Sequence, residues 1–180
     1  MPRLLAPALL LVAALASCGG KGEQAMTDFT LTSDAFTDGQ PIPPGNSCEG
    51  RDQSPELNWT DPPEGTKSLA LVVDDPDAPS GTFRHWGVYN IGPEARSLAK
   101  GAGNETGGTF SMAVNGFGKA VYGGPCPPVG HGVHHYRFKL LALDVPKLDV
   151  SAELSVEQLE AAAEPHVVGR AQLTGTYERK

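Results

Sequence analysis

Residues 68–91 read SLALVVDDPDAPSGTFRHWGVYNI, and this stretch decides the fold class. Residues 68–74 are a continuous apolar run, which predicts a fully buried strand. The run ends in a dense turn cluster at residues 75–81, and residues 83–91 then predict a second strand. Because the two strands follow each other without a helix between them, they favour an antiparallel arrangement.

The flanking sequence predicts further strands at residues 29–32, 109–114, 134–143 and 171–177. A helix is predicted to start near Ser155, which forms a capping-box pattern with Gln158. Pro165 should end or kink this helix. We therefore expect a mainly β domain that resembles an antiparallel sandwich and carries a short helix near its C-terminus.

The first residues of the chain predict export from the cytoplasm. A short positive start at Arg3 precedes the apolar residues 4–15, and this run is shorter than the about 20 residues that span a membrane. The sequence Leu15-Ala16-Ser17-Cys18 resembles the bacterial lipobox, in which the cysteine receives lipid. The alternative is an ordinary cleaved signal followed by an incidental cysteine.

This interpretation divides the chain into three parts. Residues 1–17 form a lipoprotein signal peptide, residues 18–27 form a lipidated tether, and residues 28–180 form a single domain. A domain of about 150 residues is large enough for one hydrophobic core. We expect the mature protein in the cell envelope, held to a membrane from outside the cytoplasm by lipid on Cys18.

The composition argues against several classes of protein. The chain has 14 Lys and Arg against 21 Asp and Glu, a net charge of −7, and it has no basic run. A nucleic-acid partner is therefore not expected, and we interpret the negative charge as favouring solubility. The sequence lacks the signatures of serine hydrolases, HExxH metalloproteases, P-loop proteins and Rossmann proteins. We expect neither catalysis nor a cofactor nor a bound metal.

Cys48 and Cys126 remain once Cys18 is assigned to the anchor. An even number of cysteines in an oxidising compartment is compatible with a disulfide. A bridge would close a loop of 78 residues, for which chain entropy gives roughly 4–5 kcal/mol of stabilisation. The alternative is a pair of unrelated thiols, one of which lines a binding site.

Polar side chains lie at the ends of the predicted strands. They are Asp75, Asp77, His85, His134 and Tyr136. If the strands are neighbours, these side chains converge on a pocket whose floor is Cys126-Pro127-Pro128. Protonated imidazoles donate charge-assisted hydrogen bonds to phosphate-like oxygens, and a nearby aspartate favours the protonated ring. The set therefore predicts a site for a small anion.

Some of these residues also have a purely structural interpretation. Asp75 and Asp77 could serve the turn alone, because aspartate is common in turns of this kind. His85 could be a buried histidine that is bonded to the backbone.

Strand alternation sorts the residues near the start of the strand at 134–143. His134 and Tyr136 are two apart and share a face, whereas His135 points away together with Arg137. We expect His131 and His135 to face solvent.

Ordered motifs recur from Phe29 to Tyr177. They include DPDAP at 75–79, HW at 85–86, GPCPP at 124–128, HHY at 134–136 and GTY at 175–177. Together they resemble the phosphatidylethanolamine-binding protein (PEBP) family, and within it the bacterial Raf-kinase-inhibitor-like branch. The resemblance implies a PEBP-like fold, in which a large antiparallel sheet packs on a smaller one. It also implies a pocket that accepts phosphate-type groups.

The motif match assigns this pocket to Asp75, Asp77, His85, Cys126, Pro128, His134 and Tyr136. One position departs from the family pattern, because His135 stands where the family often has arginine. We expect a membrane-anchored protein that binds a small anionic or phosphorylated ligand, with a phospholipid head group as one candidate. The alternative function is an inhibitor or regulator of a protease or of another protein partner in the cell envelope.

Overall fold

The computed structural model describes residues 29–105 and 107–180, and all structural statements concern these residues. The predicted signal peptide at residues 1–17, the lipidation site Cys18 and the tether at residues 18–27 lie outside them. None of the helices in the described ranges has the length and apolar character needed to cross a membrane.

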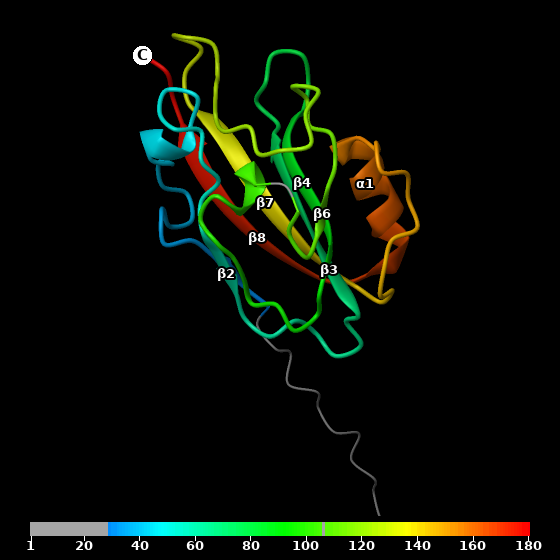
Figure 1. Ribbon diagram of the computed structural model, residues 1–180. Coiled ribbons are helices and arrows are strands. Elements are labelled where there is room, and N and C mark those ends of the chain that lie inside the picture. The colour runs from blue at the N-terminus through cyan, green and yellow to red at the C-terminus, as the bar shows by residue number, and fades with distance from the viewer. Residues whose placement is uncertain (1–28, 106) are drawn as a thin grey trace, which may run out of the picture.

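A large antiparallel sheet runs through the described part of the chain, with the strand order β6-β4-β3-β7-β8 (Figure 1). Its strands are β3 (Ser68–Asp75), β4 (Phe83–Ile91), β6 (Ser111–Met112), β7 (His134–Leu143) and β8 (Val167–Tyr177). Hydrogen-bonded partners flank β3 on both sides, and every one of its residues is buried. This central place explains the continuous apolar run at residues 68–74, because both faces of β3 are covered.

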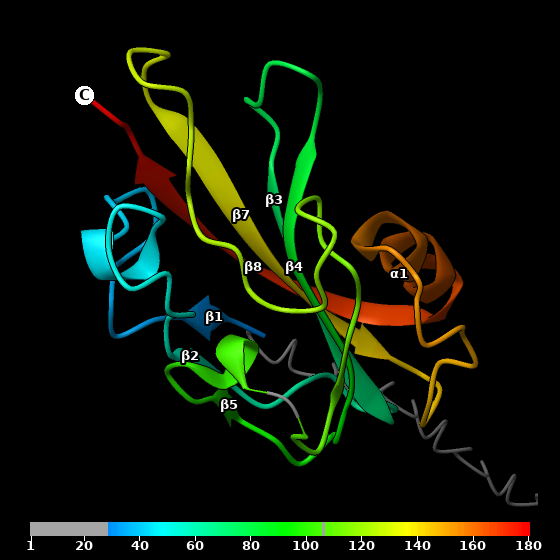
Figure 2. The same ribbon diagram turned by 45° about the horizontal axis from the view of Figure 1, so that its top comes forward.

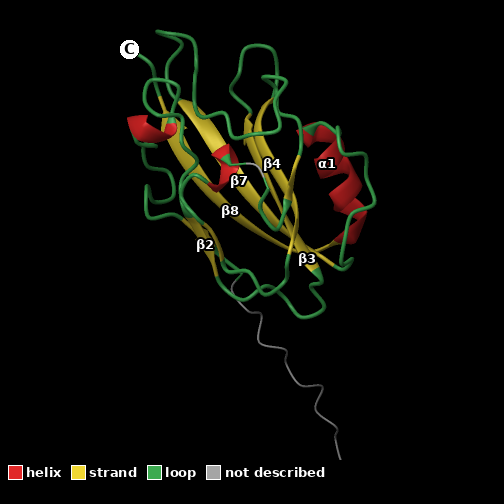
Figure 3. Cartoon of the chain, viewed as in Figure 1, coloured by secondary structure: helices red, strands yellow, loops and turns green. Residues whose placement is uncertain are grey.

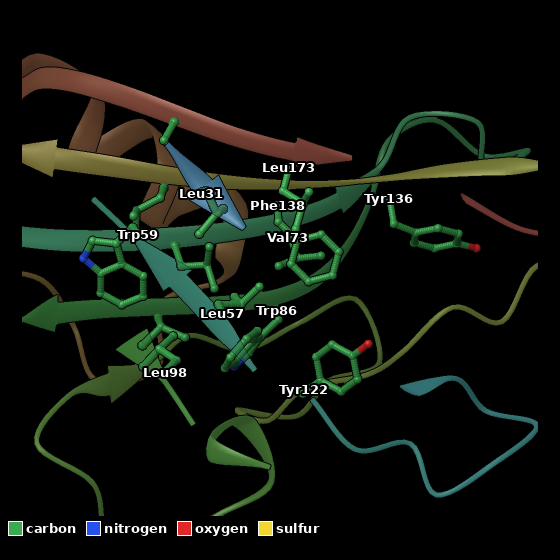
Figure 4. Packing of buried hydrophobic residues seen from close by; sticks show 14 of the residues in the cluster. Leu31, Leu57, Trp59, Val73, Trp86, Leu98, Tyr122, Tyr136, Phe138 and Leu173 are labelled. Atoms are coloured by element: carbon green, nitrogen blue, oxygen red, sulfur yellow. The ribbon is translucent and has the colours of Figure 1, made fainter. Parts of the chain in front are cut away.

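A smaller antiparallel sheet packs against one face of the large sheet (Figure 2). It consists, in the described ranges, of β1 (Leu31–Thr32), β2 (Leu57–Trp59) and β5 (Ser97–Leu98), in the order β1-β2-β5. Its apolar side chains join those of the large sheet in one core, in which Leu57, Trp86 and Phe138 are fully buried (Figure 4). The predicted mainly β fold, with a large sheet packed on a smaller one, is confirmed.

Helix α1 (Val156–Ala163) covers the opposite face of the large sheet (Figures 2 and 3). The predicted capping box is present, since the Ser155 hydroxyl accepts from the Gln158 N–H and the Gln158 side chain accepts from the Ser155 N–H. The 3-10 helix η3 (Glu164–His166), which contains Pro165, follows where α1 ends. The helix approaches the sheet closely at Gly87, where a Cβ would lie 2.8 Å from Val156 Cγ2.

The strand boundaries differ from the predicted ones at several places. The predictions missed β2 and β5, because strands of two or three residues are too short to show a periodic pattern. β8 begins at Val167 rather than at residue 171, and the strand predicted at 109–114 is confined to residues 111–112. The short 3-10 helices η1 (Pro44–Asn46) and η2 (Ala102–Asn104) lie in loops beside the smaller sheet (Figure 3).

Candidate ligand-binding pocket

A cavity of about 150 Å³ opens at the end of the large sheet where β3 ends and where β4 and β7 begin. It is lined by Asp75, Ala78, Pro79, Phe83, His85, Phe117, Cys126, Pro127, Pro128, His134 and Tyr136. Except for Asp77, every residue that the motif match assigned to the pocket is in this lining. The cavity is smaller than the roughly 300–1,000 Å³ of pockets for drug-sized ligands, so it suits a small chemical group.

β4 brings His85 to this cavity through a β-bulge. Val73 on β3 pairs with Trp86, and the next residue, Asp74, pairs with Arg84. His85 is therefore an extra residue opposite β3. Trp86 is buried in the core on the pocket side, so regular alternation would have turned His85 toward α1. The bulge lets both side chains lie on the pocket side.

His85 lies in the pocket wall as a neutral ring. Its side chain is buried, and its Nδ1 donates to the carbonyl oxygen of Gly123 at 2.7 Å. Burial lowers the pKa of His85, so the ring stays neutral and Nε2 is left as an acceptor. His85 is therefore a buried histidine bonded to the backbone, as the structural interpretation expected, and it also lines the cavity.

A hydrogen-bonded chain of side chains leads from the pocket to the surface. His134 Nδ1 lies 2.7 Å from Asp75 Oδ2, and both residues are buried. On the other side of the ring, His134 Nε2 lies 2.7 Å from Nδ1 of His131. His131 is exposed, as predicted, yet its ring contacts the pocket histidine. This contact was not foreseen, because a loop residue has no strand alternation to orient it.

Tyr136 contributes a buried hydroxyl to the cavity. The residue is 1% exposed, and its hydroxyl makes no hydrogen bond of standard geometry to the residues that the structure describes, although the Asp75 carboxylate lies near enough to act on it. Burial, followed by the nearby Asp75 carboxylate, raises the pKa of Tyr136, so the hydroxyl remains a donor. Figure 4 shows Tyr136 at one end of the packed core residues. A buried donor without a partner calls for a hydrogen-bond acceptor at this position.

Aromatic rings close the cavity beside His85. The rings of Phe83 and Phe117 lie edge-on to its imidazole, with centroids 5.0 and 5.7 Å away. The predictions missed both residues. Phe83 pairs with Asp75, but seeing this requires the strand register, and Phe117 lies in a glycine-rich stretch without a periodic signal.

Asp77, which the motif match assigned to the pocket, does not line this cavity. Its carboxylate accepts hydrogen bonds from the backbone N–H and from Nδ1 of His135, each at 2.8 Å, on the other face of β7. The strand ends at Asp75, so the rule that residues two apart share a face no longer applies. The Asp75 carboxylate accepts from the Asp77 N–H at 2.9 Å. This hydrogen bond stabilises the turn, as the structural interpretation of the two aspartates expected.

The loop that forms the opposite wall of the cavity is firmly attached to the rest of the domain. A disulfide joins Cys126 to Cys48, and the Cys48 N–H donates to the Pro125 carbonyl oxygen at 3.1 Å. The Gly124 N–H donates to the Asp52 carboxylate at 2.7 Å, in a space so tight that a Cβ would lie 2.2 Å from the carbonyl oxygen of Asn46. These contacts hold the pocket wall in place.

The polar groups of the cavity are few. No cluster of three or more His, Cys, Asp or Glu residues that could hold a metal occurs in the described ranges. The polar groups of the cavity are two imidazoles, one carboxylate and one phenol, set in an apolar wall.

Comparisons with known proteins show which family the chain belongs to. The family model described as phosphatidylethanolamine-binding protein matches residues 32–178. A UPF0098 protein of Aquifex aeolicus (strain VF5) is 43% identical over 149 residues, covering 82% of this chain and 86% of the relative. The Mycobacterium tuberculosis (strain ATCC 25618 / H37Rv) protein named "Putative lipoprotein LppC" is 38% identical over 191 residues, covering 94% of this chain and 92% of LppC.

A solved structure is similar over the same region. The crystal structure of Escherichia coli YbcL, described as a new member of the mammalian PEBP family, matches with a TM-score of 0.80 at 35% identity. The match covers 84% of this chain and 99% of YbcL. The chain belongs to the phosphatidylethanolamine-binding protein family.

Proposed function

We propose that this protein binds a small anionic or phosphorylated ligand in the pocket between β3, β4 and β7, and that it does so as a lipid-anchored protein of the cell envelope. The observation that carries the proposal is the buried Tyr136 hydroxyl, a donor without a partner among the described residues. It lines the same small cavity as His85 and His134. An oxygen of an anion supplies the acceptor that this hydroxyl requires.

The polar groups of the pocket complement a singly protonated phosphate. His134 is bonded to Asp75 through Nδ1, so Nε2 is the ring nitrogen that faces a ligand and, when it carries a proton, donates to an anionic oxygen. Tyr136 donates a second hydrogen bond. The neutral His85 offers an acceptor, which fits a P–OH group or the ammonium of a head group.

The size of the cavity limits how much of a ligand it can enclose. At about 150 Å³ it has room for a head group, and the rest of a larger ligand must lie outside. Phe117, which is 48% exposed, and Pro128 would then contact the part that leaves the pocket. The proposal therefore includes a phosphate monoester or a phospholipid head group whose remainder stays at the rim.

Sequence features support the place of the protein in the envelope. The lipobox-like sequence at residues 15–18 and the overall similarity to LppC both favour lipidation at Cys18. The Cys48–Cys126 disulfide suits an oxidising compartment outside the cytoplasm. Membrane fractionation tests this part, because Cys18→Ser should release the protein from the membrane fraction. Equal membrane retention of both proteins would overturn it.

Binding is tested by isothermal titration of inorganic phosphate and phosphoethanolamine into the wild type and the variant His134→Ala. The variant should lose binding, because it removes the imidazole whose Nε2 faces the ligand. His135→Ala is the matched control, since this neighbouring histidine is exposed and bonded to Asp77 outside the cavity. The proposal fails if wild type and His134→Ala bind both probes equally or if neither protein binds them.

A further inference from the structure

His131 occupies the hydrogen-bonding position on His134 that an anion would need. His134 has two ring nitrogens, and Nδ1 is bonded to the buried carboxylate of Asp75. The remaining nitrogen, Nε2, lies 2.7 Å from His131 Nδ1. An anion oxygen that accepts a hydrogen bond from Nε2 must therefore replace the His131 ring.

The positions of the protons decide which of the two histidines donates in the hydrogen bond between them. Because His134 Nδ1 donates to Asp75, Nε2 carries the lone pair when the ring is neutral. His131 then donates its Nδ1–H to Nε2. An anion oxygen without a proton can accept from Nε2 only when His134 carries a proton there, whereas a P–OH group can donate to the lone pair, and in either case His131 leaves with its own proton.

The loop around His131 permits the ring to leave. Gly130 and Gly132 flank it, with φ angles of +73° and +91°, and no atom lies within 4 Å of a Cβ built on either one. The loop backbone is held up to this point by hydrogen bonds from the Gly130 N–H to the Arg179 carbonyl oxygen and from the His131 N–H to the Pro128 carbonyl oxygen. The exposed ring can therefore turn outward without disturbing the start of β7.

We propose that His131 is a gating residue, whose ring covers Nε2 of His134 and competes with the anion for it. This inference rests on the proposed function, because it assumes that the anion binds in this pocket. It adds a residue that limits affinity and that a ligand must displace.

Other charged groups near the gate do not supply the proton. Burial keeps His85 neutral and the Tyr136 hydroxyl protonated. Arg179 faces the loop from the C-terminal segment, where its Nη1 donates to the Pro127 carbonyl oxygen at 3.3 Å and its Nε lies 3.5 Å from Glu49 Oε1.

The pair Asp77 and His135 lies on the other face of β7, where the two side chains are bonded to each other. Asp75 is the carboxylate that contacts His134 directly. The hydrogen bond that the anion must break therefore joins His131 and His134.

The test is isothermal titration of inorganic phosphate at pH 7 into the wild type, His131→Ala and His135→Ala. Removing the competing ring should tighten phosphate binding about three- to tenfold, the factor that one net hydrogen bond is worth. His135→Ala should bind like the wild type. Equal or weaker binding by His131→Ala would overturn the gate, and equal binding would leave the proposed function intact. If none of the three proteins binds phosphate, the proposed function fails, and the gate fails with it.

A spectroscopic readout follows the gate itself. In protein with ¹⁵N-labelled histidine, the ring nitrogens of His131 should shift when phosphate is added, because its hydrogen bond to His134 is broken. The His135 ring serves as the internal control and should not shift. Phosphate binding that leaves the His131 ring signals unchanged would contradict the displacement.

Discussion

Asp74 and Asp75 are consecutive residues of β3, yet three cationic side chains surround the Asp74 carboxylate, whereas the Asp75 carboxylate faces the pocket. The Asp74 side chain is fully buried on the α1 face of the sheet. It lies 2.7 Å from Arg84 Nη1, 2.7 Å from Arg137 Nε and 2.6 Å from Lys139 Nζ. Glu160 of α1 pairs with Arg84 and Lys139 as well. We call these five residues the charge cluster.

On the pocket face, the polar groups are fewer and are not all satisfied by one another. Asp75 is bonded to His134, and the Tyr136 hydroxyl has no partner in the part of the chain that the structure describes. Because neighbouring residues of a strand point to opposite faces, the two carboxylates at the end of β3 serve two different sites. On the Asp74 side, ion pairs with Glu160 join α1 to the sheet, and the Asp75 side faces the cavity for which we propose a ligand.

The largest expected effect comes from breaking the charge cluster. Asp74→Asn should lower the free energy of unfolding by about 3–5 kcal/mol, because it leaves the surrounding cations without their buried counter-charge. Urea unfolding measures this loss. Phosphate affinity of the folded variant should stay near the wild-type value, since the cluster lies on the other face. A loss below about 1 kcal/mol would show that the cluster is not structural.

The disulfide tests whether the pocket wall needs its covalent attachment. Replacing Cys48 and Cys126 together by serine should cost about 2–4 kcal/mol of unfolding free energy. Unlike the change at Asp74, it should also weaken phosphate binding, because Cys126 lines the cavity. Unfolding and titration on the same sample separate the two effects. Unchanged phosphate affinity would mean that the other contacts suffice to hold the wall.

A smaller effect is expected from pH, and it should arise on the pocket face. Burial lowers the pKa of His85 below its ordinary value of 6.5, so the unfolded chain takes up a proton at this residue before the folded chain does. Stability should therefore fall as the pH drops below about 6.5. The free energy of unfolding of wild type and His85→Asn should be measured between pH 7.5 and 5, a range chosen around the ordinary histidine pKa of about 6.5. Plotted against pH, it should change less steeply in the variant than in the wild type. Parallel slopes would contradict a neutral buried His85.

The smallest effect is expected from Asp77→Asn. Its partner His135 is exposed, and surface ion pairs contribute about 0–1 kcal/mol. Stability should change within that range, and phosphate affinity should not change. A clear loss of phosphate binding would show that Asp77 takes part in ligand binding, and it would contradict a role in the turn alone.

The sequence allowed the sheet and most of the pocket to be predicted, for identifiable physical reasons. Long strands such as β4 and β7 have clear patterns, and their predicted bounds match the structure. Alternation also separated His134 from His135 correctly, as the buried and the exposed side chain confirm.

The remainder depended on features that no periodic pattern encodes. Asp77 lies outside the cavity lining because the strand ends at Asp75 and a turn follows it. The bulge at His85 changes the face that this side chain occupies, and it becomes visible only in the pairing of β3 with β4. The contact between His131 and His134 depends on the path of a glycine-containing loop.

The Tyr136 hydroxyl offers the most direct test of the claim that the pocket face takes an anion. Titration of inorganic phosphate should be compared between the wild type and Tyr136→Phe, a change that removes one oxygen atom and keeps the ring. We expect about tenfold weaker binding or more, because a hydrogen bond to a charged group is worth roughly 1.5–3 kcal/mol. Identical phosphate affinities of the two proteins would contradict the claim that an anion binds to the Tyr136 hydroxyl in this pocket.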